Sequence, residues 1–479
     1  MIPCRHSMYR RALLLAALAG LSPAATADTL TVGPGLGTYD FLTITAAVAS
    51  AVDGDEIVIE PGVYPENIVI SNRDITLRRS ANSGDVIVFG QSLGSVIVLD
   101  ASVVTLQGLT ITGGLSDIGA GVFSPNDSEV TIESCIIENN VANSGSAVGG
   151  GVYASRRLTM RDSIVRNNSS QNRGGGVDIR GVGPHVIERS HFESNSAGDV
   201  DASPDAGGAI ATESTDETVI RESVFVGNSS TWRGGAIATF INTTRLENCT
   251  FETNSSPRGG VLWISDNDAV LASNCLFIEN DAAAFGGVVY NEQLFDAVNC
   301  TFVGNTDGSD NDSFQGVRAD AVARLRNCVV TNPGAGSHGG IGIYDPHYSL
   351  IPEATAMPDS SGNFSADPMF VDGFGGDYRL MAGSPAIDAG DSLDMAGLSG
   401  ISVLTLAADL DGNVRNLDDQ SAPNAGIPAW ELNIDMGAYE FQPSNAGPGC
   451  SIADVAAPFG VLNFFDVAAY ISEFNVGCP

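Results

Sequence analysis

Six residues place arginine guanidinium groups and aromatic rings at matched positions of a recurring phrase. Each arginine stands directly before a glycine pair, and each ring stands two residues after the GGx step: Arg173, Arg233, Arg258, Tyr153, Trp263 and Tyr290. Side chains alternate between the two faces of a strand. The residue before each ring is apolar and is expected to point inward, as for Val152, Leu262 and Val289, so each ring should point outward. Outward rings can stack on sugar faces, and arginines can form forks with carboxylate or sulfate groups. The pattern predicts a carbohydrate-binding surface. The alternative is that the rings shield the sheet and the arginines neutralise nearby acids.

Arg173 and Asp178 are the candidate pair for catalysis. Asp178 falls in the same outward column as Tyr153, and an arginine base acting with Ca²⁺ held by acidic residues is one such chemistry. The chain contains no lysine, so a lysine base is excluded. Paired carboxylates at glycosidase spacing stay open as an alternative, because sequence order does not give distances.

A repeat positions these residues. Between Cys135 and Asn332 a phrase recurs every 25 to 33 residues, roughly the period of a repeat architecture. Its first half alternates apolar and polar residues, as in ESVFVGN at 222–228 and NCTFETN at 248–254, and its second half is a glycine pair with an apolar step, as in GGAI at 207–210. Such short alternation predicts strands, so each unit is strand, turn, strand, turn.

One unit of this kind cannot bury its apolar face alone, so neighbouring units must stack, with each strand pairing in parallel with its equivalent one coil later. The handedness rule for parallel crossovers then makes the coil right-handed. The predicted fold class is all-β, a right-handed parallel β-helix over residues 28–335. An amphipathic helix at about 42–52 is expected to cap its first coil, and strands are expected at 56–60, 75–77, 86–89, 96–99, 103–106 and 109–111.

Equivalent residues of such a solenoid form columns. One column is a turn ladder of asparagines with a structural role, in which the side-chain amide tolerates left-handed backbone: Asn140, Asn168, Asn195, Asn228, Asn254, Asn280 and Asn305. Another holds cysteines where other units have serine: Cys135, Cys249, Cys275, Cys300 and Cys328. Because stacked neighbours satisfy disulfide geometry poorly, we expect a buried column of small side chains.

The glycine and Phe-x-x-Asn marks of the phrase resemble the repeats of the chlamydial polymorphic outer-membrane proteins. The matches lie at 207–210, 234–237, 192–195, 225–228, 251–254, 277–280 and 302–305. The resemblance implies a surface β-helix of the pectate-lyase-like architecture. Enzymes of that architecture cut polyuronides, but the polygalacturonase and pectate lyase signatures are absent here, and Gly336-Ser337-His338-Gly339 lacks the partners of a Gly-His-Gly site.

Charge and the N-terminus indicate where the protein acts. Of 479 residues 57 are acidic and 22 basic, all of them arginine, which gives a net charge of −35. This balance argues against nucleic acid and anionic membrane surfaces as partners. It suits salty surroundings or bound divalent cations, and the alternative is that it only keeps the surface soluble. Residues 1–27 have the arginines, apolar run and small-residue site of a secretory signal peptide.

No later run has the roughly 20 apolar residues of a membrane helix. We therefore expect a secreted or cell-surface protein of the cell envelope, with no transmembrane segment after signal removal.

The phrases GDYRLMAGSPAIDAGD at 376–391, ADLDGNVRNLD at 408–418 and DMGAYEF at 435–441 resemble the choice-of-anchor Q domain. The resemblance implies that residues 336–442 end the β-helix with a capping module that precedes an anchoring signal, and we expect it to plug the C-terminal end. Asp409, Asp411 and Asn413 have the spacing that opens a Ca²⁺ loop, although Gln420 stands at the twelfth position.

After a linker at 443–449, residues 450–479 resemble the GC-type dockerin-like tail of some planctomycete secreted proteins. The resemblance implies a small EF-hand or dockerin-like unit that anchors the chain through a docking partner. Asp454, Asn463 and Asp466 fall near its loop positions and are candidate Ca²⁺ ligands. Cys450 and Cys478 bracket the unit, and we expect them to form a disulfide in an oxidising compartment.

Two functions follow from these observations. One is a non-catalytic β-helix that binds a polysaccharide or another cell-surface component and is anchored through its tail. The other is a pectate-lyase-like polysaccharide lyase, or a glycoside hydrolase, that acts on acidic polysaccharide with Ca²⁺ as the cofactor. The long repeat, the absent signatures and the lack of lysine favour the first, while the fold alone decides neither.

Overall fold

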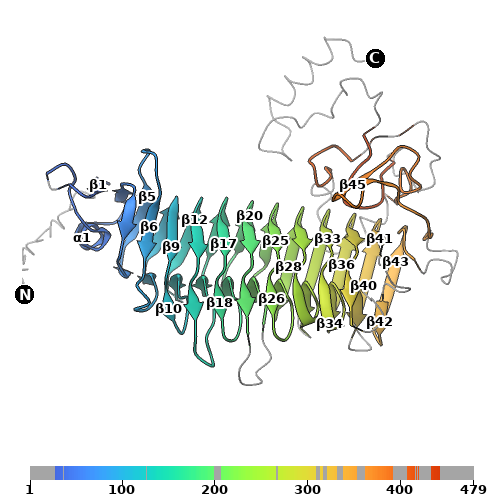
Figure 1. The fold of residues 1–479 in the computed structure, drawn as a ribbon, viewed down its shortest axis with the longest axis horizontal. Coiled ribbons are helices and arrows are strands. Elements are labelled where there is room, and N and C mark those ends of the chain that lie inside the picture. Colours follow the sequence, from blue (N-terminus) through green and yellow to red (C-terminus); the bar gives the residue numbers. More distant parts are fainter. Residues whose placement is uncertain are drawn as a thin grey trace, which may run out of the picture.

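The chain winds into a long solenoid made of four parallel sheets (Figure 1). The computed structural model describes residues 27–35, 37–125, 127–198, 206–265, 268–308, 313–316, 321–331, 338–352, 362–391, 407–415, 417, 419 and 433–442. Each full coil passes through sheets I, II, III and IV in turn, and every strand pairs in parallel with its equivalent in the next coil. The predicted all-β parallel solenoid is confirmed.

Sheets I and II form the two faces that follow each other first in a coil. Sheet I has 13 strands: β1 (Thr29–Val32), β2 (Glu56–Ile59), β5 (Asp74–Arg79), β8 (Val103–Gln107), β12 (Glu129–Glu133), β16 (Leu158–Arg161), β20 (His185–Glu188), β24 (Thr218–Arg221), β28 (Asn242–Glu247), β32 (Asp268–Ser273), β36 (Leu294–Val298), β40 (Val322–Arg326) and β43 (Ile343–His347). Sheet II has 11 strands: β3 (Gly62–Tyr64), β6 (Val86–Phe89), β9 (Leu109–Thr112), β13 (Ile136–Glu138), β17 (Ile164–Arg166), β21 (His191–Glu193), β25 (Val224–Val226), β29 (Thr250–Glu252), β33 (Leu276–Ile278), β37 (Thr301–Val303) and β41 (Val329–Thr331).

Sheets III and IV complete the coil. Sheet III has eight short strands: β10 (Leu115–Ser116), β14 (Val141–Ala142), β18 (Ser169–Ser170), β22 (Ser196–Ala197), β26 (Ser229–Ser230), β30 (Ser255–Arg258), β34 (Asp281–Phe285) and β38 (Thr306–Asp307). Sheet IV has 11: β4 (Ile68–Ser71), β7 (Ile97–Asp100), β11 (Val122–Ser124), β15 (Val152–Ala154), β19 (Val177–Gly181), β23 (Ile210–Ser214), β27 (Ile237–Thr239), β31 (Leu262–Ile264), β35 (Val289–Asn291), β39 (Phe314–Gly316) and β42 (His338–Gly340). The early strands agree with the predicted ones within two residues.

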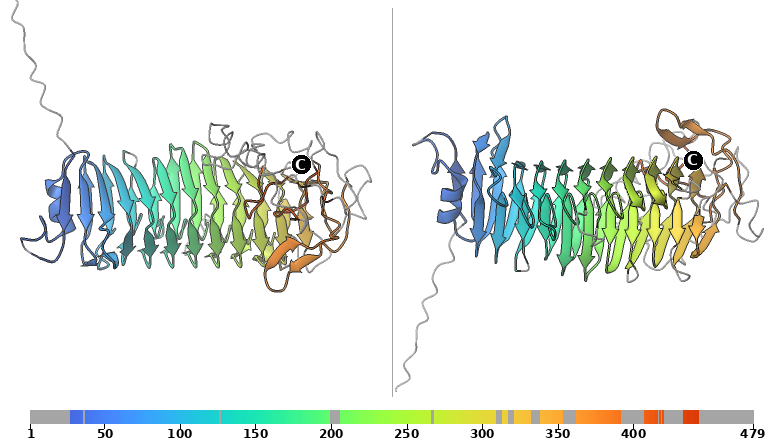
Figure 2. Two further views of the ribbon diagram at one scale, coloured as in Figure 1. Left: turned by 90° about the horizontal axis from the view of Figure 1, so that it is seen from above. Right: turned by 60° about the horizontal axis from the view of Figure 1, so that its bottom comes forward.

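A helix closes the N-terminal end, as predicted. Helix α1 (Ile44–Ser50) lies against the first coil in two views (Figures 1 and 2). Thr43 is its N-cap, and the Thr43 hydroxyl accepts a hydrogen bond from the Ala46 amide. Ile44, Ala47 and Val48 are buried, so the apolar face of the helix covers the end of the core.

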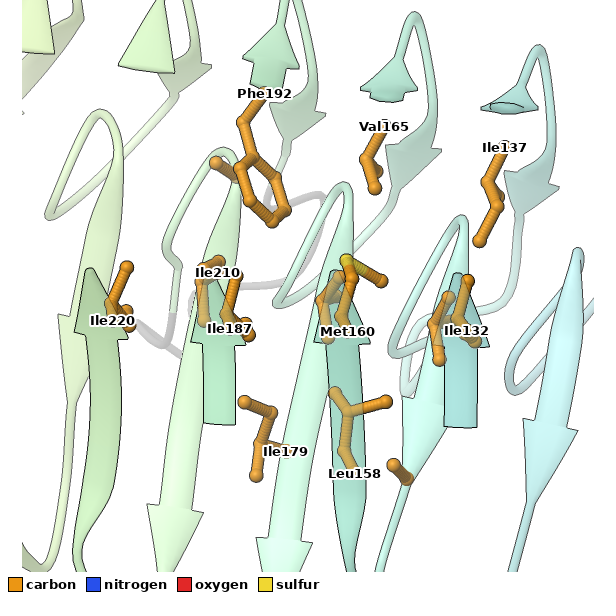
Figure 3. Close-up of a cluster of buried hydrophobic side chains, with 14 of the residues drawn as sticks. Ile132, Ile137, Leu158, Met160, Val165, Ile179, Ile187, Phe192, Ile210 and Ile220 are labelled. Atoms are coloured by element: carbon orange, nitrogen blue, oxygen red, sulfur yellow. The ribbon is translucent and has the colours of Figure 1, made fainter. Parts of the chain in front are cut away.

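The core fills the inside of the solenoid. Alternation sends every second side chain of a strand inward, and successive coils stack these side chains in columns (Figure 3): Ile132, Ile137, Leu158, Met160, Val165, Ile179, Ile187, Phe192, Ile210 and Ile220. In sheet II five phenylalanines continue one such column: Phe192, Phe225, Phe251, Phe277 and Phe302. Their neighbouring ring centroids lie 4.7 to 5.0 Å apart, which is the spacing of adjacent coils.

The predicted asparagine ladder is confirmed. Asn195 illustrates the pattern, because its Nδ2 donates to Asn228 Oδ1 at 3.0 Å and to the Val165 carbonyl at 2.8 Å. One detail differs from expectation: the left-handed backbone falls on the residue before each ladder asparagine, such as Ser194 with φ 54°. The asparagine instead satisfies the buried backbone groups that this tight turn exposes.

The five cysteines at 135, 249, 275, 300 and 328 are buried and free, which confirms the predicted column of small side chains. Cys135 Sγ donates to the Leu106 and Glu133 carbonyls, and the Ser163 hydroxyl at the equivalent position donates to the Arg161 carbonyl, the counterpart of Glu133. Burial raises the pKa of the Cys135 thiol to about 11, so the thiol is protonated at neutral pH.

The C-terminal module lies along the side of the last coils (Figures 1 and 2). Its described residues include an antiparallel pair, β44 (Phe370–Asp372) and β45 (Asp377–Leu380). Tyr378 packs on Leu276 and Ile278, which point outward from sheet II. The module was expected at 336–442 and at the open end, but β42 and β43 at 338–347 still belong to the solenoid, and the described residues from 370 on cover the outer face of sheet II at β33, β37 and β41. The linker at 443–449 and the tail lie outside the described residues.

Candidate functional site

The candidate catalytic pair forms a buried ion pair. Asp178 on β19 is fully buried, and its carboxylate accepts hydrogen bonds from Arg173 Nε at 2.7 Å and Arg180 Nε at 2.8 Å. Arg173 is 4% exposed and also pairs with Glu213, at 2.9 Å. The register confirms that Asp178 stands in the column of Tyr153, but the pair is covered, so neither charge reaches solvent as a base would need to.

Phe240 is what covers Arg173. The Arg173 guanidinium carbon lies 4.1 Å from the centroid of the Phe240 ring, and the same ring meets Trp263 edge-on at 4.9 Å. Arg173 is therefore part of the packing on the outer face of sheet IV. Its guanidinium is therefore not available for the bidentate contact with a carbohydrate that the sequence predicts.

Tyr153 lies apart from the other two predicted rings. It packs on Phe123 at 5.5 Å and beneath Arg180, and it is half-buried. Between Tyr153 and Trp263 the same column holds Asp178, Ala211 and Ala238. Four steps of about 4.8 Å each, or about 19 Å, therefore separate the two rings along the solenoid.

The other four predicted residues do come together, and Trp232 joins them. We call Trp232, Arg233, Arg258, Trp263 and Tyr290 the arginine–aromatic cluster. Arg233 and Arg258 bridge in register across neighbouring coils. The Arg258 guanidinium lies 4.0 Å from the Trp232 ring, and that of Arg233 lies 4.5 Å from the Trp263 ring. Rings and guanidinium groups thus alternate, an arrangement that cation–π attraction favours.

The rings of this cluster differ in exposure. Trp263 points outward but is only 5% exposed, because Arg233 and Phe240 cover it. Its indole nitrogen donates to Glu292 Oε1 at 3.1 Å, and Arg233 Nη1 lies 3.5 Å from the same oxygen. The prediction that Trp263 offers an exposed ring is therefore wrong. Trp232 and Tyr290 are half-buried and keep part of their surface in solvent.

Trp232 and Glu292 were missed by the sequence analysis. Trp232 directly precedes Arg233 in the phrase TWRGG, so its neighbour was a usable signal. Glu292 follows Tyr290 by two residues in one coil and reaches Arg233 only because the coils stack in parallel, which puts residues 59 positions apart side by side.

A shallow hollow of about 450 Å³ lies over sheet III beside this cluster. Uncharged side chains line it, among them Asn143, Ser169, Gln171, Ser196, Ser229 and Thr231. An uncharged lining in a chain of net charge −35 leaves the hollow free of local repulsion toward an anion. Thr231, one of the lining residues, directly precedes Trp232 in the chain.

The predicted Ca²⁺ ligands of the module form a turn. Asp409 is buried, and its Oδ1 accepts the Asn413 amide at 2.7 Å while its Oδ2 accepts the Glu440 amide at 2.9 Å. Burial and the charge of Asp409 raise the pKa of Asp411. Among the described residues no group of three or more His, Cys, Asp or Glu side chains could hold a metal ion. Asp454, Asn463, Asp466, Cys450 and Cys478 lie outside the described residues. Calcium stays a prediction.

An acidic network that Glu440 connects to Asp409 holds the module together. Asp435 accepts the Asp388 amide at 2.8 Å, and Glu440 accepts the Asp435 amide at 3.1 Å beside Arg415. Burial raises the pKa of Asp435 to about 7 and raises that of Glu440 as well. These carboxyls act as acceptors for backbone groups of the module.

No helix in the described part of the chain is both long and apolar enough to cross a membrane.

Comparisons of sequence and of structure find matches among known proteins. The family model described as the right handed beta helix region matches residues 159–317. The metabotropic glutamate receptor-like protein R of Dictyostelium discoideum is 29% identical over 177 residues, which are 36% of this chain and 10% of that protein. A crystal structure of the pectate lyase Pel9A is 14% identical with a TM-score of 0.47, covering 88% of this chain and 98% of its own. A pectin methylesterase in complex with a hexasaccharide is 15% identical with a TM-score of 0.30, covering 48% of this chain and 80% of its own. The family match and the four stacked parallel sheets identify the fold as a right-handed parallel β-helix.

Proposed function

We propose that this protein is a non-catalytic polysaccharide-binding scaffold, exported and held at the cell surface through its C-terminal tail. The arginine–aromatic cluster carries the proposal. It offers half-buried rings and guanidinium groups on the outer face of a rigid solenoid, and sugars are bound by such combinations of ring faces and hydrogen-bond donors.

The buried pair of Arg173 and Asp178 supports a binding role over catalysis. A general base must reach the proton that it abstracts, and Asp178 is fully buried between two arginines. The uncharged hollow over sheet III extends across β14, β18, β22 and β26 and includes Thr231, the residue before Trp232, so a polymer chain could follow it along the solenoid.

Retention on immobilised polymers tests binding. The full chain is passed over neutral, uronic-acid and sulfated polysaccharides with and without Ca²⁺, and the unsaturated products and reducing ends released are measured in parallel. We expect retention on at least one polymer without release of products. Cleavage of any polymer in the panel would contradict the non-catalytic scaffold and indicate a lyase or hydrolase.

Two matched variants locate the surface. Tyr290→Ala removes a half-buried ring of the cluster, and Phe374→Ala removes a fully exposed ring of the C-terminal module. We expect the first to weaken retention and the second to leave it unchanged, with circular dichroism as the check on folding. Equal retention of both variants would mean that the binding surface lies outside the arginine–aromatic cluster.

Attachment is tested separately in cells that express the chain. We expect a chain that ends at Gln442 to appear in the medium and the full chain to stay with the cells. If the two chains partition equally between cells and medium, the tail does not attach the protein to the cell.

A further inference from the structure

Arg258 lacks the carboxylate partner that most described arginines of the solenoid have, and Arg73, whose Nη1 donates to the Asn72 carbonyl, is the other described arginine without one. Arg161, Arg166 and Arg245 face carboxylate oxygens at 2.8, 2.7 and 2.6 Å. No carboxylate oxygen of the described residues lies within 4.0 Å of the Arg258 guanidinium, which rests on the Trp232 ring. Arg258 is thus one of two described arginines without an acidic partner, in a chain with 57 acidic residues and 22 arginines, and of the two it is the one that lies against an aromatic ring and a second arginine.

A second arginine adjoins it. Arg233 and Arg258 occupy equivalent places of neighbouring coils, about 4.8 Å apart along the solenoid. That spacing is between their backbones, and it places two positive side chains on adjacent coils, where an anion close to both would offset their mutual repulsion. The one described carboxylate that pairs with either is Glu292, at 3.5 Å from Arg233. The cluster therefore carries one more positive charge than negative.

Two N–H groups in the cluster also lack acceptors. Trp232 Nε1 and Arg233 Nε are buried, and neither finds a hydrogen-bond acceptor among the described residues. Buried donors are almost always satisfied in folded proteins, by protein, solvent or a ligand. Both donors lie next to Arg258, which has no carboxylate partner. Unsatisfied N–H donors and an unbalanced positive charge therefore occur together in the arginine–aromatic cluster.

We infer that Arg258, with Arg233 and Trp232, forms a subsite for an oxyanion substituent, a carboxylate or a sulfate ester, on the polysaccharide that the protein is proposed to bind. This inference rests on the proposed function and names its ligand class. The planar guanidinium presents paired donors that match the oxygens of such a group, and Trp232 holds the Arg258 fork in place from one side. The half-buried ring of Tyr290, 5.8 Å from Arg233, lies where the sugar bearing the anion would pack.

The matched variants are Arg258→Gln and Arg166→Gln. Arg166 is a partly exposed arginine of sheet II that is paired with Glu138, so its loss controls for the change in net charge. Binding of the full chain is measured by calorimetry with polyuronate, with a sulfated polymer of equal length and with a neutral glucan. We expect Arg258→Gln to lower affinity for an anionic polymer by about tenfold, as for loss of one charge-assisted pair, and to leave the neutral glucan unchanged. Comparison of the two anionic polymers tells uronate from sulfate.

Equal affinity of the wild type and Arg258→Gln for both anionic polymers would overturn the subsite, and so would an equal loss on the neutral glucan. If the wild-type protein binds no polymer, the proposed function fails, and the subsite is then judged with small anions. Sodium sulfate and glucuronate are titrated while the indole N–H resonances are followed by NMR, with Trp232→Phe to assign the Trp232 signal. A shift of that signal in the wild type that Arg258→Gln abolishes would keep the anion subsite, and no shift would overturn it.

Discussion

Asn274 and Arg415 are 141 residues apart in sequence and are joined by a hydrogen bond of 3.1 Å from Arg415 Nε to Asn274 Oδ1. Asn274 Nδ2 also donates to the Ala408 carbonyl at 2.9 Å, and Arg415 Nη2 donates to the Gly437 carbonyl at 2.7 Å. The Arg415 side chain is fully buried. One asparagine at a corner of the solenoid thus satisfies groups that the C-terminal module buries against it.

Asn274→Ala should loosen the module. The change leaves the buried Arg415 Nε without its Asn274 acceptor and the Ala408 carbonyl without its Asn274 donor, and each group left unpaired costs about 1 to 3 kcal/mol. We expect faster hydrogen exchange at the amides of Gly437 and Ala438, with the solenoid amides unchanged. Ser134→Ala is the control, because the exposed Ser134 has the same left-handed backbone at this corner in an earlier coil. Equal effects of the two changes would mean that only the turn was disturbed.

The sequence predicted the solenoid well but not the place of this module. Alternation, the glycine steps and the period determine strands and stacking locally, so the coils and the asparagine ladder followed from them. The docking surface joins segments more than a hundred residues apart, which no local pattern encodes. A signal was nevertheless present in the corner column, where asparagine occupies only the last four of these coils: Ser134, Asp162, Arg189, Glu222, Asn248, Asn274, Asn299 and Asn327.

The candidate site was predicted in part for a similar reason. The repeat places Arg233, Arg258, Trp263 and Tyr290 in neighbouring coils, and the structure brings them together. Periodicity also gives the direction of a side chain, but it does not show what covers that side chain. Trp263 and Asp178 point outward as expected and are nevertheless buried, because Phe240 and three arginines fold over them.

Asn228→Ala should destabilise the middle of the solenoid. Asn228 is fully buried, its Oδ1 accepts from Asn195 Nδ2 at 3.0 Å, and its Nδ2 donates to the Phe192 carbonyl at 2.9 Å. Losing the amide leaves several buried groups unpaired, so we expect the free energy of unfolding to fall by about 3 kcal/mol or more. Denaturant unfolding measures it, with Ser229→Ala, the next residue along, as the control. A loss as small as that of the control would mean that water replaces the amide.

Arg173→Gln should change stability and leave polysaccharide binding intact. Asp178 is fully buried, and removing one partner of a buried ion pair costs about 3 to 5 kcal/mol. The partly exposed pair of Arg166 and Glu138 serves as the comparison, for which we expect a loss of about 1 kcal/mol or less from Arg166→Gln. Thermal unfolding gives the stability, and retention of the folded fraction on polysaccharide gives the binding. If the Arg173→Gln variant is well folded but is no longer retained on polysaccharide, Arg173 is part of the binding surface.

Asp268→Asn should make the protein more resistant to unfolding at high pH. Asp268 is 3% exposed, and its Oδ1 accepts the Ala269 amide at 2.6 Å while its Oδ2 has no hydrogen-bond partner among the described residues. Burial raises the pKa of Asp268 to about 7, above the value of about 3.9 in an unfolded chain. The folded state therefore holds an extra proton, so this contribution to stability is fully present below about pH 4 and is lost as the pH rises through about 7.

The size of the effect follows from the same difference. Three pKa units correspond to about 4 kcal/mol, lost by the wild-type protein between acidic and alkaline pH, and the neutral amide of the variant removes this loss. The measurement is the denaturation midpoint of wild type and Asp268→Asn from pH 5 to pH 9, taken as a difference so that Asp435, whose pKa is also raised, cancels. Asp127→Asn on the exposed surface controls for net charge. A difference that stays constant across this pH range would show that Asp268 does not titrate there, and that its Oδ2 finds a donor in solution.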